Sequence, residues 1–79
     1  MNSENPIDRQ VGDRLRVRRF ALQMKPEELA VALGISLLQV YEWEAGTRSI
    51  EAEHLPEIIR VLGVVPEFFS ADRSPRTLP

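Results

Sequence analysis

The segment EELAVALGISLLQVYEWEAG, residues 27–46, contains two short helical patterns separated by a glycine. The preceding residue, Pro26, suits the first turn of a helix, and Gly34 suits the end of one. Ser36 follows, with a glutamine three residues later, which is the spacing of a capping box at the start of a second helix. The segment therefore predicts a helix from Pro26 to the residue before Gly34, a tight turn, and a helix from Ser36 that ends before Gly46.

Apolar residues at helical spacing predict three more helices and no strand. The first covers Asp8–Leu22, another runs from Ala52 or Glu53 to Leu62 with Pro56 in its first turn, and a short last helix starts at Pro66 and carries Phe68 and Phe69. The fold class is therefore all-α, with five helices. Residues 8–70 are expected to form one domain, with residues 1–7 and 71–79 as flexible termini.

The same spacing predicts which side chains form the core. The first helix presents an apolar stripe that includes Ala21 and Leu22, and Trp43 is interpreted as a core residue or a dimer contact. The other expected core residues are Leu15, Leu29, Ala30, Leu33, Ile35, Val40, Leu55, Ile58, Leu62 and Phe68.

Composition excludes several classes of site. The chain has 79 residues and no cysteine, so it offers one small domain without disulfides or thiolate metal ligands. Its single histidine, His54, has no second histidine with which to share a metal. No apolar run approaches the roughly 20 residues that span a membrane, and no signal peptide is visible, so a soluble cytoplasmic protein is expected.

Five short helices leave little room for a substrate pocket, which usually needs about 300 Å³ or more. Ser36, His54 and the carboxylates have no spacing that places them together as a catalytic set. The sequence therefore predicts no enzymatic activity, no cofactor and no metal.

Charge is distributed unevenly along the chain, although the net charge is only −2. Residues 1–25 contain six basic and three acidic residues, whereas residues 26–79 contain four basic and nine acidic residues. This asymmetry indicates a basic surface on an acidic body; an ordinary solvated helix face is the alternative interpretation.

Four motifs together resemble one family of DNA-binding domains, the lambdoid repressor and Cro class, or XRE family. They are VGDRLRVRR at 11–19, EELAVALGIS at 27–36, QVYEWEAG at 39–46 and HLPEIIRVLGVVPEFF at 54–69. The resemblance implies a compact five-helix, lambda-repressor-like helix-turn-helix domain. It also implies double-stranded DNA as the partner, a homodimer, and a third helix that enters the major groove while helix starts contact phosphates.

Projecting the family pattern onto this chain assigns roles to individual residues. The base-facing set is Leu37, Leu38, Gln39, Tyr41 and Glu42, with Ala45 beside it. The side chains expected to contact the DNA backbone are Arg9, Arg14, Arg16, Arg18, Lys25, Ser36 and Arg48. Arg19 and Glu44 stand where the family has a structural ion pair between the first and third helices.

Several positions depart from the family pattern. Relatives begin the second helix with Ser-Gln, where this chain has Lys25 and Pro26, and they place a glycine where this chain has Gln23. Two base-facing positions that are usually polar hold leucines, and Glu42 brings negative charge toward phosphates. The DNA-facing surface is therefore unusual for the family.

Two functions compete at these leucines. Leu37 and Leu38 can pack on thymine methyl groups while Glu42 accepts from cytosine N4 and Gln39 pairs with adenine, as in a sequence-specific transcriptional regulator. Alternatively, the leucines form an apolar patch in a helix-turn-helix module adapted to a protein partner, such as an antitoxin-like or co-regulator domain with weak or no DNA binding. The DNA-binding hypothesis is preferred.

Overall fold

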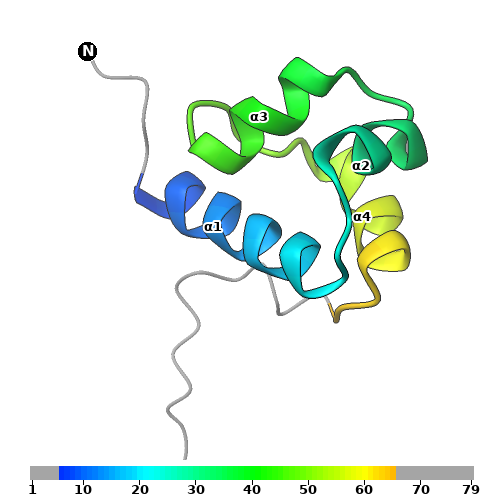
Figure 1. Cartoon of the computed structure of the whole chain (residues 1–79). Coiled ribbons are helices and arrows are strands. Elements are labelled where there is room, and N and C mark those ends of the chain that lie inside the picture. Colours follow the sequence, from blue (N-terminus) through cyan, green and yellow to red (C-terminus); the bar gives the residue numbers. More distant parts are fainter. Residues whose placement is uncertain (1–5, 66–79) are drawn as a thin grey trace, which may run out of the picture.

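The computed structural model describes residues 6–65, and all of its regular structure in this range is helical (Figure 1). The elements are α1 (Pro6–Ala21), α2 (Pro26–Leu33), α3 (Leu37–Ala45), the 3-10 helix η1 (Ala52–His54) and α4 (Leu55–Leu62). The all-α prediction is confirmed for the described residues. The helix predicted from Pro66 lies outside them, so the count of five helices stays a prediction.

Local signals determine where α2 and α3 begin and end. Pro26 is the first residue of α2, and Gly34 ends the helix with a φ of 71°. The cap of α3 is Ser36, whose Oγ accepts a hydrogen bond from the Gln39 N–H at 3.1 Å, and Gly46 ends the helix with a φ of 78°. Left-handed backbone of this kind favours glycine, because glycine has no Cβ to clash with the chain. The predicted boundaries of α2 are confirmed, and α3 begins at Leu37, one residue after the predicted start at Ser36, which is its cap.

The helix predicted from residue 52 or 53 to Leu62 is divided into two parts. Residues 52–54 form η1, and α4 begins at Leu55. The reason is Pro56, which has no N–H to donate to the carbonyl oxygen of Ala52 four residues earlier. The chain instead forms a tighter turn, in which the Leu55 N–H donates to the carbonyl oxygen of Ala52.

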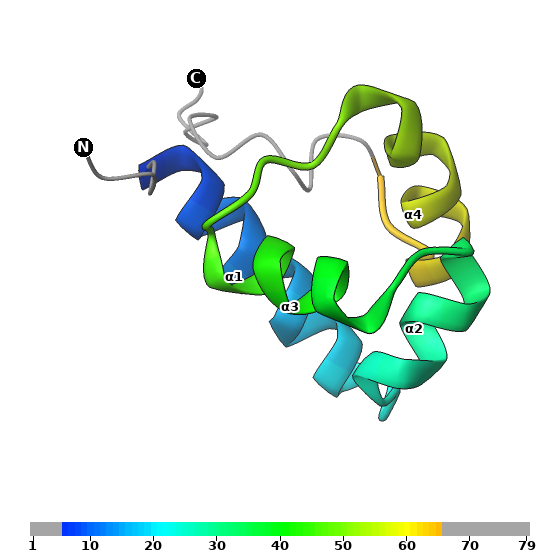
Figure 2. The same ribbon diagram turned by 90° about the horizontal axis from the view of Figure 1, so that it is seen from above.

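The buried core draws on all four α-helices. Its members are Leu15, Leu29, Ala30, Val40, Trp43, Ile58 and Leu62. Figures 1 and 2 show α1 beside α3 and α2 beside α4, and α3 contacts both α1 and α2. The helix that follows the turn is therefore held from two sides.

Most of the predicted core is confirmed, with corrections at its edges. Leu33 and Ile35 are only partly buried against the core, Leu55 is half-buried, and Phe68 lies outside the described residues. The prediction for Ala21 and Leu22 was wrong: both are exposed, because α1 ends at Ala21 and the chain then turns toward α2. Trp43 belongs to the core, with 1% of its surface exposed.

The backbones of α1 and α3 are in direct contact at Gly12. A Cβ at this position would overlap the carbonyl oxygen of Trp43 and lie 2.9 Å from that of Glu44. A second contact lies at the end of α3, where a Cβ on Gly46 would lie 2.7 Å from the Cα of Arg9. Glycine is therefore required at both positions for the two helices to pack this closely.

We expect Gly12→Ala to lower the free energy of unfolding by about 3 kcal/mol, because the added methyl group must push two backbones apart. Gly34→Ala is the matched control: its Cβ would have no atom within 4 Å, and only the positive φ is unfavourable. That variant should lose about 1 kcal/mol. Urea unfolding of both proteins measures the difference, and equal losses would contradict the packing argument.

Gln23 lies in the turn between α1 and α2 with a φ of 57°, which is unfavourable for a residue with a side chain. We expect Gln23→Gly to raise the free energy of unfolding by about 0.5–1 kcal/mol, since glycine adopts this backbone without a steric penalty. Gln23→Ala retains the Cβ and should bring no gain. A rise in both variants, measured by thermal unfolding, would locate the effect in the side chain and not in the backbone.

Candidate nucleic-acid interface

The side of α3 that faces away from the core carries the residues predicted to face bases. Val40, Trp43 and Glu44 are the buried residues of this helix. Leu38 and Tyr41 are the most open of the predicted base-facing set, with 64% and 48% of their surfaces exposed. The remaining members, Leu37, Gln39 and Glu42, are half-buried. The helix therefore presents a mixed surface of leucine, tyrosine, amide and carboxylate groups.

The first turn of α3 suits an anion better than the first turn of α2. Two glutamates lie in the first turn of α2, Oε1 of Glu28 accepts from the Lys25 N–H at 2.8 Å, and Pro26 has no N–H. The first turn of α3 contains no acidic residue, and its cap, Ser36, is neutral. Because carboxylates offset the positive end of a helix dipole, α3 retains more attraction for a phosphate.

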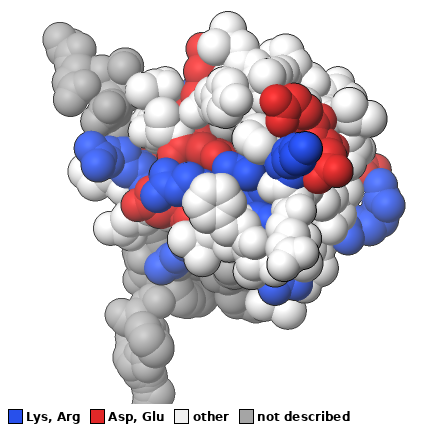
Figure 3. Space-filling view, viewed as in Figure 1, with Lys and Arg blue, Asp and Glu red and all other residues white. Residues whose placement is uncertain are grey.

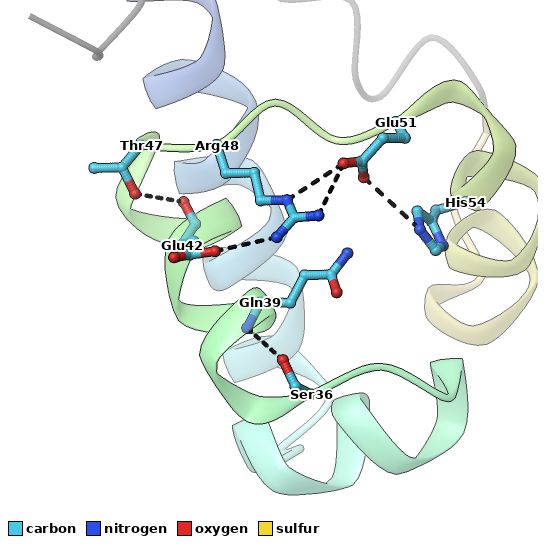
Figure 4. A network of polar contacts seen from close by, with 7 residues as sticks. All are labelled: Ser36, Gln39, Glu42, Thr47, Arg48, Glu51 and His54. Atoms are coloured by element: carbon cyan, nitrogen blue, oxygen red, sulfur yellow. Dashed lines mark hydrogen bonds and ion pairs between the residues drawn. The ribbon is translucent and has the colours of Figure 1, made fainter.

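Arg48 lies in the loop after α3 and contacts two carboxylates (Figure 4). Its Nη1 is 3.3 Å from Oε1 of Glu42, and its Nε and Nη2 are 3.3 and 3.2 Å from Oε2 of Glu51. Hydrogen bonds to Glu51 and then to Glu42 raise the pKa of Arg48. The pKa of Glu51 is lowered by its own backbone N–H and then by Arg48. Arg48 and Glu51 are therefore both charged at neutral pH.

The loop that carries Arg48 is itself tied to neighbouring elements. The N–H and the Oγ1 of Thr47 lie 3.1 and 3.3 Å from the carbonyl oxygen of Glu42. Nε2 of His54 lies 3.7 Å from Oε1 of Glu51, and the imidazole packs edge-on against Trp43 with ring centroids 5.2 Å apart. Sequence reasoning missed Thr47, Glu51 and His54 as parts of this surface. The spacing of three residues from Arg48 to Glu51 was a usable signal.

The basic residues of α1 differ in their surroundings. Arg16 pairs with Asp13 at 2.9 Å on the surface. Arg18 Nε donates to the carbonyl oxygen of Leu62 at 2.8 Å and so connects α1 to the end of α4. Arg14 is half-buried, and Lys25 is exposed at the start of α2. On the face seen in Figure 3, basic and acidic side chains lie next to one another and do not form a separate basic stripe.

Arg19 and Glu44 form a buried, bidentate ion pair between α1 and α3. Nε of Arg19 is 2.7 Å from Oε2 of Glu44, and Nη2 is 2.9 Å from Oε1. The Nη1 of Arg19 donates to the carbonyl oxygen of Met24 at 2.9 Å, in the turn before α2. The hydrogen bond to Glu44 raises the pKa of Arg19. One guanidinium thus connects α1, α3 and the turn between α1 and α2.

We expect Arg19→Met to lower the free energy of unfolding by about 3–5 kcal/mol, because it leaves the buried Glu44 carboxylate without its partner. The double variant Arg19→Met/Glu44→Leu removes both charges and should recover much of this loss. Chemical denaturation of the wild type, both single variants and the double variant closes the cycle. Additive losses in the double variant would show that the two residues do not act as a pair.

None of the helices in residues 6–65 is long and apolar enough to cross a membrane. Within the same residues, no group of three histidine or acidic side chains could hold a metal ion.

Comparison with known proteins adds information about ancestry. A family profile described as helix-turn-helix matches residues 15–69. An uncharacterized HTH-type transcriptional regulator of Sinorhizobium medicae is 43% identical over 68 residues, which cover 86% of this chain and 49% of that protein. An uncharacterized transcriptional regulator in the ATPase CF(0) region of Rhodospirillum rubrum is 38% identical over 66 residues, which cover 84% of this chain and 61% of that protein. The chain thus spans about half to three fifths of the length of these relatives.

Proposed function

We propose, from the premise that this chain belongs to the XRE-type helix-turn-helix family, that it is a sequence-specific DNA-binding transcriptional regulator. The observation that carries the proposal is the arrangement of α2 and α3. Only residues 34–36 separate the two helices, and α3 keeps one side open while its other side is buried against α1 and α2. A helix held in this way can enter the major groove while the rest of the domain rests on the DNA backbone.

The open side of α3 carries chemistry that can distinguish bases. Leu37 and Leu38 offer methyl groups that match the thymine methyl, and the Gln39 amide can pair with adenine. Glu42 can accept a hydrogen bond from cytosine N4. The mixed polar and apolar character of this surface supports direct reading of base edges.

Contacts with phosphate would come from the start of α3 and from basic side chains around it. The neutral cap at Ser36 leaves the positive end of the α3 dipole available, and Lys25 is exposed at the start of α2. The surface pair between Arg16 and Asp13 can exchange its carboxylate for a phosphate. A homodimer would read two half-sites about 34–36 Å apart, because one domain makes few base contacts.

A second candidate function rests on the exposed apolar groups of α3. Leu38 and Tyr41 are 64% and 48% exposed, and neighbouring apolar side chains of this kind are common at protein–protein interfaces. Under this alternative the helix contacts a protein, and DNA binding is weak or absent.

Selection of bound sequences from random duplex DNA, followed by titration at several salt concentrations, tests the proposal. We expect a preferred sequence and an affinity that falls linearly with salt on logarithmic axes, because bound phosphates release counterions. A chain that binds no duplex, or binds without dependence on salt, would contradict the proposed function.

Leu38→Ala separates the two candidates. If α3 reads thymine methyl groups, the variant should bind the selected duplex about fivefold more weakly, roughly 1 kcal/mol, and a scrambled duplex unchanged. Val17→Ala on α1 is the matched control, since Val17 is 61% exposed. It should leave both affinities unchanged. Unaltered DNA discrimination together with altered sedimentation of Leu38→Ala would support the protein-binding alternative.

A further inference from the structure

We propose that Arg48 is a positioning residue for base recognition: it orients the Glu42 carboxylate on α3 instead of contacting phosphate itself. This inference rests on the proposed function and deepens it, because it predicts a base pair with an exocyclic amine, such as cytosine N4, opposite Glu42. The family resemblance favours a phosphate contact for Arg48, and the geometry of this chain argues for a different role.

The first argument is that the guanidinium is already engaged. Nη1 of Arg48 contacts Glu42, and Nε and Nη2 both contact one oxygen of Glu51 (Figure 4). These contacts use three of the five N–H groups of the guanidinium. A phosphate that displaced the carboxylates from them would leave two negative side chains close together. An Arg48 that stays between them offsets the charge of both. The planar fork of arginine suits this bridging geometry, whereas the compact ammonium of lysine does not.

The second argument is the path of the loop. Gly46 turns the chain with left-handed backbone, and Thr47 ties the loop to the carbonyl oxygen of Glu42. The turn brings Arg48 back beside a residue six positions earlier. Glu51 holds the far side of the guanidinium, and Glu51 itself lies beside His54, which packs against the buried Trp43. Contacts therefore run from the core through the loop to the base-facing carboxylate.

The third argument concerns the second oxygen of the Glu42 carboxylate, which Arg48 does not contact. Oε1 of Glu42 faces Arg48, and Oε2 accepts no hydrogen bond from the described residues. A carboxylate with one oxygen held and the other open presents a single oriented acceptor. Hydrogen-bonding sites of this kind discriminate between bases only when their direction is fixed, because a free glutamate can also turn toward solvent. Arg48 supplies that fixed direction.

The test measures discrimination at one base pair. The position read by Glu42 is identified on selected duplexes as the one whose preference disappears in Glu42→Gln. The wild type should prefer the cytosine-containing pair there by about tenfold. Arg48→Lys and Glu51→Gln should each reduce this preference to about twofold or threefold. In the Glu42→Gln background, Arg48→Lys should cause no further loss, because the residue acts through Glu42.

Opposite results are expected if Arg48 binds phosphate. Arg48→Lys and Glu51→Gln would then both keep the preference at the Glu42 position, and that result overturns the positioning role. General affinity is not the readout, because loss of the Glu51 charge should strengthen binding to every duplex under either role. Arg60→Lys and Glu57→Gln, which alter a surface ion pair on α4, are the matched controls and should leave the preference unchanged. Thermal unfolding of each variant confirms that it is folded.

The outcomes also separate this inference from the proposed function. If the wild type binds selected duplexes and Arg48→Lys keeps the same base preference, the positioning role alone is contradicted. A wild type that binds DNA but has no position whose preference depends on Glu42 also contradicts it. A wild type that binds no duplex overturns both proposals.

Discussion

The contact between the backbones of α1 and α3 is the constraint on which the rest of the domain depends. At Gly12 the two helices leave no room for a Cβ, so their separation is set by main-chain atoms and not by adjustable side chains. The Arg19–Glu44 pair then fixes the rotation of the helices relative to each other. Since Arg19 also binds the carbonyl oxygen of Met24, the same interaction sets the path of the chain into α2.

Because of this constraint, α3 has one side buried in the core and one side open. Val40, Trp43 and Glu44 are buried, so the opposite side of the helix is oriented by the core and not by a ligand. Caps at Ser36 and Gly46 end the helix at defined residues and prevent its first and last turns from extending. Such a rigid surface binds with a small loss of conformational entropy. Arg48, in contrast, lies in a loop and depends on ion pairs for its position.

The parts of the fold that depend on local chemistry could be predicted from the sequence, and the parts that depend on distant contacts could not. Pro26, Ser36 and Gly46 act within a few residues, so the sequence predicts the boundaries of α2 and α3 to within one residue. The role of Gly12 requires the carbonyl groups of Trp43 and Glu44, 31 and 32 residues further along the chain, and no local pattern indicates it. Likewise, helical spacing places Leu22 on the apolar side of α1, but the helix ends before that residue.

The same distinction applies to the candidate interface. The predicted base-facing set comes from the family pattern projected onto one helix, whereas the partners of Arg48 depend on how the loop after Gly46 returns over α3. These partners also help to explain how a chain with a net charge of −2 could bind DNA. If Glu42 and Glu51 share one guanidinium, the repulsion between these carboxylates and phosphate is reduced without adding a phosphate contact. Under the proposed function, sequence-independent affinity would then stay low, and a larger share of the binding energy would come from base contacts, which favours discrimination over tight general binding.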